Sequence, residues 1–283
     1  MRRSPLALTL SLVVALAAPV AAQSHQHDYT AEMSHAHKDD QPVASPAART
    51  APAAPVVTEE VVYGTVDGKP VKGFLARPAK GGKRLPAVVV VHEWWGLNDN
   101  IREMTKRLAG EGYAALAVDL FGGQVATTPD SAGRLYQAAM QRIPAGERNL
   151  RAAIAYLKSQ GATRIGSVGW CFGGHWSLRT GLAGGRDVAA VVAYYGPPIT
   201  DAKELGRLQA PLLGLYGGKD QGIPVDSVRA MERQLTSLGK TVEIRIYPEA
   251  SHAFANPSGK AYDPIAAADA WKRTVAFFQA HLK

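Results

Sequence analysis

Residues 164–174 read Arg-Ile-Gly-Ser-Val-Gly-Trp-Cys-Phe-Gly-Gly, and they indicate the fold more clearly than any other segment. A short apolar strand runs into a sharp turn centred on Cys171, and a helix is predicted to follow over residues 172–182. This is the G-x-S-x-G nucleophile-elbow pattern with cysteine in the place of serine. Side chains at Gly169 and Gly173 would clash with neighbouring backbone in so tight a turn.

The turn places the Cys171 sulfur at the amino end of a helix, where partial positive charge favours thiolate over thiol. A buried structural cysteine in a glycine-rich turn is the alternative reading of the same residues. The strand before the turn and the helix after it form the context that a nucleophile elbow requires. We therefore predict that Cys171 is a nucleophile.

Strand and helix signals alternate on both sides of this turn. Apolar runs, typical of strands buried on both faces of a sheet, occupy residues 87–91, 113–120, 188–195 and 211–216. Residues 241–247 are predicted to form a further strand. Helical spacing occurs over residues 100–109, 147–160, 225–238 and 263–282, and a hairpin opens the series at 60–66 and 69–77. The pattern predicts one α/β domain over residues 58–283, with a mostly parallel sheet and helices on both faces.

Composition narrows the possible functions. The chain has 283 residues, of which 46% are hydrophobic and 20% charged, and a formal charge of +8. Its single cysteine excludes an intrachain disulfide and a multi-cysteine metal cluster. Because Lys and Arg never run beyond two in succession, no nucleic-acid-binding stripe is expected.

The first 22 residues resemble a secretory signal. Arg2 and Arg3 precede an apolar run over residues 6–20, and Val20-Ala21-Ala22 offers a small-x-small cleavage site. The run is too short for a comfortable membrane span, which disfavours an uncleaved anchor. We expect a periplasmic or secreted protein that makes no membrane contact once the signal is removed.

Residues 23–57 are predicted to be a disordered linker. The segment holds four histidines with aspartates close by: His25, His27, His35 and His37. An Ala/Pro-rich stretch with few large apolar side chains follows them. A soluble spacer is one interpretation. The other is weak binding of Zn²⁺ or Cu²⁺, and it supports a second hypothesis for the whole chain: a non-catalytic exported α/β protein with a His-rich metal-binding tail.

An elbow nucleophile needs an acid and a histidine later in the chain, in that order. Asp220 follows the strand at 211–216, and His252 follows the strand at 241–247. His252 would act as the base, and Asp220 would fix its tautomer. Asp226 is the rival acid, but it falls in the first turn of a helix, and His92 is the rival base.

The loop after the strand at 87–91 reads His-Glu-Trp-Trp-Gly-Leu over residues 92–97. Such a loop supplies one backbone N–H to an oxyanion hole, so we nominate the amides of Trp94 and Phe172.

We expect Cys171 to donate a hydrogen bond to Glu93 at rest, which would keep the sulfur protonated and limit its oxidation. A surface carboxylate is the alternative for Glu93. Trp94 and Trp95 either wall a pocket or pack in the core.

Three stretches make the chain similar to the dienelactone hydrolase family of the α/β-hydrolase fold: residues 92–96, residues 169–174, and residues 217–220 with 251–254. The resemblance covers about residue 61 to the C-terminus. It implies an α/β-hydrolase domain with a Cys171–Asp220–His252 triad, and a Glu93 that releases the thiolate when substrate binds. It implies hydrolysis of a small ester or lactone through an acyl-cysteine, without a metal or organic cofactor. We place Trp95, Trp170 and Phe254 in the substrate pocket.

The chain departs from the family pattern where two arginines clamp the substrate carboxylate. Gly122-Gly123 and Asn256 stand at those places, and neither can replace a bidentate guanidinium. Arg134 and Arg142 are the candidates to compensate. The sequence therefore predicts an exported cysteine hydrolase, but it fixes neither the substrate nor the oligomeric state.

Overall fold

The computed structural model describes residues 29–38, 40, 42–82 and 84–283. The predicted signal peptide, and with it His25 and His27, lies outside the described residues. In the described part eight strands form one sheet: β1 (Val56–Val66), β2 (Lys69–Pro78), β3 (Ala87–Val91), β4 (Ala114–Val118), β5 (Ile165–Trp170), β6 (Ala190–Tyr194), β7 (Leu212–Gly217) and β8 (Val242–Tyr247).

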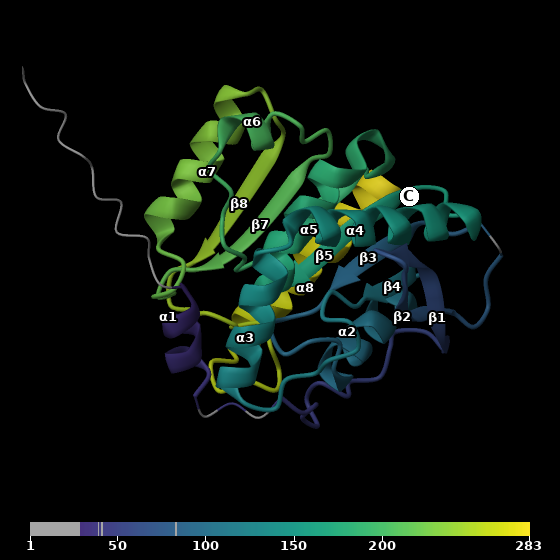
Figure 1. Ribbon diagram of the computed structural model, residues 1–283, viewed down its shortest axis with the longest axis horizontal. Helices are drawn as coiled ribbons and strands as arrows, with labels where there is room; N and C mark the ends of the chain where they lie inside the picture. The colour runs from purple at the N-terminus through teal and green to yellow at the C-terminus, as the bar shows by residue number, and fades with distance from the viewer. Residues whose placement is uncertain (1–28, 39, 41, 83) are drawn as a thin grey trace, which may run out of the picture.

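Helices occupy most of the connections between these strands (Figure 1). They are α1 (Tyr29–Ala36), α2 (Asp99–Gly110), α3 (Pro129–Met140), α4 (Ile143–Ser159), α5 (Phe172–Gly184), the 3₁₀ turn η1 (Gly185–Asp187), α6 (Ala202–Leu205), α7 (Val225–Ser237) and α8 (Pro264–Leu282).

The sheet has the strand order β1-β2-β4-β3-β5-β6-β7-β8. The pairs β1–β2 and β2–β4 are antiparallel, and every later pair is parallel. All residues of β3, β5, β6 and β7 are buried, as expected for apolar strands covered on both faces. The predicted mostly parallel sheet is confirmed.

Neighbouring residues of β5 show that helices cover both faces, because successive side chains of a strand point in opposite directions. A Cβ on Gly166 would contact Phe278 and Leu282 of α8. The hydroxyl of Ser167 donates to the carbonyl of Ser177 in α5, at 3.0 Å. Helix α8 therefore lies on one face and α5 on the other, and Figure 1 shows α8 behind the strands with α4 and α5 in front.

Several elements differ from the sequence prediction, which did not include the short elements α6 and η1. Strand β1 begins at Val56, inside the predicted linker. Helix α3 was not predicted; it begins with Pro129 and with a capping box between Thr128 and Ser131.

The prediction of disorder is wrong for the described residues between 29 and 57. Helix α1 packs on the domain, and Met33 is only 1% exposed, with its methyl group against Gly222. Further along, the backbone N–H and hydroxyl of Ser45 bond to Ser258 and to the carbonyl of Pro257. Composition misled here because a few large side chains suffice to dock a segment on a preformed surface, although they could not build a core of their own.

Among the described residues, none of the helices combines the length and the apolar character that crossing a membrane would require.

Candidate active site

Cys171 occupies the predicted sharp turn between β5 and α5. Its backbone has φ 57° and ψ −120°, in the left-handed half of the Ramachandran plot that side chains avoid. A Cβ on Gly169 would collide with the backbone of Gly173, and one on Gly173 would collide with the carbonyl of Val91. Only glycine fits both places, so the elbow geometry is as predicted and the sulfur stands at the amino end of α5.

His252 and Asp220 come together beside this turn. Nδ1 of His252 lies 2.7 Å from Oδ2 of Asp220, and both side chains are buried. Oδ1 of Asp220 accepts the backbone N–H groups of Gly222 and Ile223, which fixes the carboxylate in place. The rival acid Asp226 is exposed on the first turn of α7.

Cys171 and His252 shift each other's protonation. Burial alone would raise the pKa of the Cys171 thiol, but His252 and His37 lower it to about 5. Burial alone would lower the pKa of His252, but Asp220 and Cys171 raise it to about 10. Between these values the pair exists as thiolate and imidazolium.

The other buried histidines have structural partners. His92 Nε2 accepts the backbone N–H of Leu120, so its proton sits on Nδ1 and is donated to the carbonyl of Glu93, at 2.6 Å. His175 lies between the carbonyl of Pro197 and the guanidinium of Arg179. Among the histidines of residues 58–283, these two are therefore held by other partners, whereas His252 lies beside Cys171.

Glu93 is buried near the sulfur, but not with the partner we expected. Asn256 Nδ2 donates to Glu93 Oε2 at 2.8 Å, and no hydrogen bond from Cys171 to Glu93 occurs in the described part of the chain. Burial, and then the charge of Cys171, raise the pKa of Glu93 to about 8. The carboxyl group is therefore neutral at pH 7. Asn256, at the place of the second family arginine, holds this carboxyl group.

The predicted pocket aromatics fall into two groups. Trp94 and Trp95 are buried with ring centroids 5.0 Å apart, at the site. Trp170 packs on Tyr194 at 5.4 Å, and Phe254 packs among tyrosines in the core beneath the site. Contact of Trp95, Trp170 and Phe254 with substrate stays a prediction.

Neither candidate arginine reaches the site. Arg142 pairs with Asp67 at 2.8 Å on the surface, and Arg134 is exposed on α3. Gly122 and Gly123, which stand at the place of the first family arginine, form a turn with φ of 65° and 87°. The idea that Arg142 replaces the missing clamp is wrong in this conformation.

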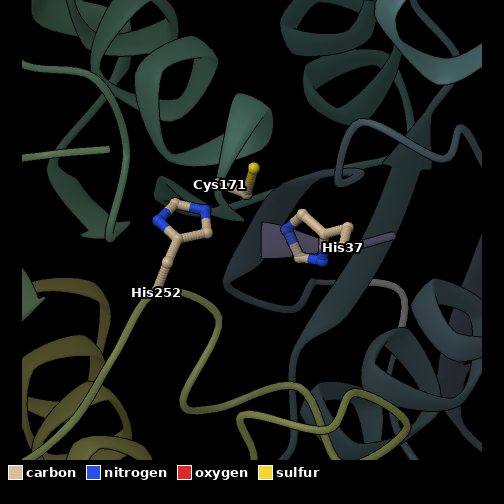
Figure 2. Close-up of side chains that lie close together, drawn as sticks. All are labelled: His37, Cys171 and His252. Carbon is tan, nitrogen blue, oxygen red and sulfur yellow. The ribbon is translucent and has the colours of Figure 1, made fainter. Parts of the chain in front are cut away.

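Three side chains from the predicted linker, Tyr29, Met33 and His37, cover the site, and the sequence interpretation missed them. The Tyr29 hydroxyl lies 3.3 Å from the Cys171 sulfur. The ring of His37 lies against Trp94, with centroids 5.1 Å apart, and 5.7 Å from the ring of His252. Figure 2 shows the imidazoles of His37 and His252 on either side of Cys171. Cys171 is consequently only 1% exposed, and the site is closed.

The domain has the α/β-hydrolase fold. This follows from the strand order of its sheet, from the elbow after β5, and from the order Cys, Asp, His along the chain. The family model described as "Dienelactone hydrolase family" matches residues 71–282. The chain belongs to the dienelactone hydrolase family, and it is a hydrolase of carboxylic ester or lactone bonds.

Named relatives agree with this placement. A "Putative carboxymethylenebutenolidase" of Methylorubrum extorquens is 34% identical over 256 residues, which cover 84% of this chain and 86% of the relative. A protein of the same name from Escherichia coli is 31% identical, over 84% of this chain and 93% of the relative. The structure titled "Putative Dienelactone Hydrolase" from Klebsiella pneumoniae has 29% identity and a TM-score of 0.73, covering 80% of this chain and all of that one. The non-catalytic alternative has no support in these matches.

Proposed function

We propose that this hydrolase cleaves a small ester or lactone through an acyl-cysteine formed on Cys171. The observation that carries the proposal is the convergence of three groups from separate loops: the elbow sulfur, the imidazole of His252 and the carboxylate of Asp220. This is the arrangement of an activated nucleophile, a base and a group that orients the base.

In the proposed first step the Cys171 thiolate attacks the substrate carbonyl carbon. The negative charge that develops on the carbonyl oxygen meets the backbone N–H groups of Trp94 and Phe172, neither of which donates a hydrogen bond to another described residue. The imidazolium of His252 then gives its Nε2 proton to the leaving alkoxide. This step leaves an acyl-cysteine and a neutral imidazole.

In the second step His252 takes a proton from water, and the resulting hydroxide attacks the acyl carbon. The C–S bond breaks, so the acid is released and the thiolate–imidazolium pair is restored. Asp220 holds Nδ1–H throughout and stabilises the charged ring. The neutral Glu93 beside the sulfur adds no negative charge that would oppose thiolate attack.

The substrate class follows from what surrounds the nucleophile. No arginine among the described residues contacts the site, so recognition of a substrate carboxylate by a guanidinium clamp has no support. A small uncharged ester or lactone suits walls made of Trp94 and Trp95. Because Tyr29, Met33 and His37 close the site, entry of substrate requires that α1 move away.

The test is a panel of lactones and activated esters with intact-protein mass spectrometry. We expect turnover and a transient adduct equal to the acyl group, both lost in Cys171→Ala. The matched control is Thr236→Ala, an exposed position on α7 where turnover should not change. Equal turnover by the wild-type protein and Cys171→Ala would overturn the proposal.

We also propose export to the periplasm or beyond the cell, on the strength of the basic start, apolar run and small-x-small site in residues 1–22. Cell fractionation and N-terminal sequencing test this part. A mature chain that begins at Gln23 outside the cytoplasm is the expected result, and an intact N-terminus in the cytoplasm contradicts it.

A further inference from the structure

Where the N-terminal segment crosses the elbow, three side chains suited to a metal ion converge. One ligand atom from each of His37, Cys171 and His252 lies within 4.8 Å of the other two, and all three side chains are buried (Figure 2). The sulfur belongs to the proposed nucleophile, but His37 has no part in the proposed hydrolysis. Its position therefore calls for a separate explanation.

The imidazoles of His37 and His252 lie on either side of the Cys171 sulfur. Nε2 of His37 and Nε2 of His252 are buried and bond to no nitrogen or oxygen atom among the described residues. Both rings instead interact with the Cys171 sulfur, whose pKa they lower. Two such nitrogens beside one thiol form a donor set that suits a metal ion.

Both histidines are also oriented as metal ligands usually are. Nδ1 of His37 lies 2.7 Å from Oδ2 of Asp40, and Nδ1 of His252 lies 2.7 Å from Oδ2 of Asp220. A carboxylate on Nδ1 fixes the ring and directs the Nε2 lone pair at a metal. The two imidazoles come from opposite ends of the chain and still share this arrangement.

We propose that the closed N-terminal segment completes a binding site for one Zn²⁺ ion, coordinated by Nε2 of His37, Sγ of Cys171 and Nε2 of His252. Thiolate sulfur and imidazole nitrogen are ligands that Zn²⁺ prefers, and three protein ligands leave one position for water. Ligand atoms around a tetrahedral Zn²⁺ lie about 3.4–3.6 Å apart by its usual bond lengths. Atoms now up to 4.8 Å apart therefore approach one another by roughly an ångström as the ion binds.

The ion would couple metal binding to activity. It would occupy the sulfur lone pair needed for attack and the Nε2 needed for proton transfer, and any proton on either nitrogen would go to solvent. It would also bind α1 to the domain, so the site would stay closed. This consequence rests on the proposed function, whereas the binding site itself rests only on the geometry.

The experiment titrates the purified protein with Co²⁺, and then with Zn²⁺ as competitor, without substrate. Thiolate coordination gives Co²⁺ a sulfur-to-metal charge-transfer absorption, which reports on Cys171 directly. We expect one Co²⁺ per chain with this band, displacement by Zn²⁺, and loss of the band in Cys171→Ser. Asp40→Asn should weaken Zn²⁺ binding by about 10- to 100-fold, as removal of the carboxylate partner of a ligand histidine does elsewhere. His37→Ala should weaken it at least as much.

The matched control is His281→Ala. Arg164, which precedes β5, donates to the carbonyl of His281, so this histidine lies at the end of the sheet opposite Cys171. Its substitution should leave Co²⁺ binding unchanged. Equal affinities in the wild-type protein, His37→Ala and Asp40→Asn would overturn the site, as would a bound ion without the sulfur band.

The two proposals can fail separately. If no ester is cleaved but Co²⁺ binding depends on His37 and Cys171, the metal site stands and the proposed function falls. If esters are cleaved through Cys171 and Zn²⁺ neither binds nor inhibits, the reverse holds. Inhibition by Zn²⁺ at the concentrations that displace Co²⁺, relieved by a chelator, is the expected result when both are correct.

Discussion

The hydrolase domain and the N-terminal segment that covers it are held in place by very different means. The domain has four strands whose every residue is buried. The anchoring of residues 29–48 comes from few side chains: Met33, Ala44 and Ala48 are buried, and the rings of Tyr29 and His37 pack on Tyr136 and Trp94. Burial of one methionine contributes about 2 kcal/mol, whereas a domain is stable by about 5–15 kcal/mol. The segment can therefore leave the site while the domain stays folded.

The largest effect is expected inside the domain. Asp220→Asn removes the carboxylate that raises the pKa of His252, so the imidazolium and the Cys171 thiolate should both be lost at neutral pH. We expect kcat/KM to fall about 10³- to 10⁴-fold, as in other triads that lose this group. Alkylation of Cys171 should have its midpoint near pH 5 in the wild-type protein and move toward the ordinary thiol value near 8.5 in the variant.

The rival acid provides the control for this substitution. Asp226→Asn changes an exposed carboxylate in the first turn of α7 and should leave the rate and the alkylation profile as they are. If the two variants lose activity equally, or if the wild-type alkylation midpoint lies near pH 8.5, the assignment of Asp220 is wrong.

Removal of the N-terminal segment that covers the site should increase the reactivity of Cys171. A variant without residues 1–40 lacks Tyr29, Met33 and His37, so the sulfur becomes accessible. Alkylation of Cys171 at pH 7 should accelerate about tenfold or more, because the wild-type site reacts only in the fraction of molecules that are open. Mass spectrometry after a timed pulse of iodoacetamide measures the rate. An unchanged rate, with an unchanged melting temperature as evidence of folding, would mean that the segment does not control access.

A single anchor should reproduce part of this effect. Met33→Ala removes the side chain that packs on Gly222 and should destabilise the closed segment by about 2 kcal/mol. We expect alkylation to accelerate by up to about 30-fold, since 1.36 kcal/mol corresponds to a factor of ten, without a lower melting temperature of the domain. Val43→Ala is the control, because Val43 lies in the same segment and is 63% exposed. Equal effects from both substitutions would show that burial of Met33 does not hold the segment.

The same comparison explains what could be predicted from the sequence. Apolar strands and the G-x-C-x-G turn are local signals, so the sheet, the elbow and the positions of Asp220 and His252 could be predicted from residues 58–283. The closed site could not, because it depends on Met33, Tyr29 and His37 reaching a surface built by residues far along the chain. The histidines of residues 35–37 had suggested metal binding, but composition gave no sign that Cys171 and His252 would complete the set.

The smallest effect is expected at Glu93, and it concerns stability more than catalysis. The pKa of this carboxyl is about 8 in the folded protein, above the value near 4.5 of an exposed glutamate. The unfolded chain therefore releases the proton at lower pH than the folded protein does. Stability falls as pH rises from about 4.5 to about 8, and the native carboxyl stays neutral over that range.

Glu93→Gln replaces the neutral carboxyl with a group of the same shape that cannot ionise. It should raise the free energy of unfolding at pH 8 by on the order of 4 kcal/mol and change it little at pH 4. Chemical denaturation at the two pH values measures the difference. Alkylation of Cys171 at pH 7 should stay close to the wild-type rate, because the charge beside the sulfur is the same in both proteins. If the variant gains no stability at pH 8, Glu93 is ionised in the folded protein, and a negative charge then stands beside the sulfur during attack.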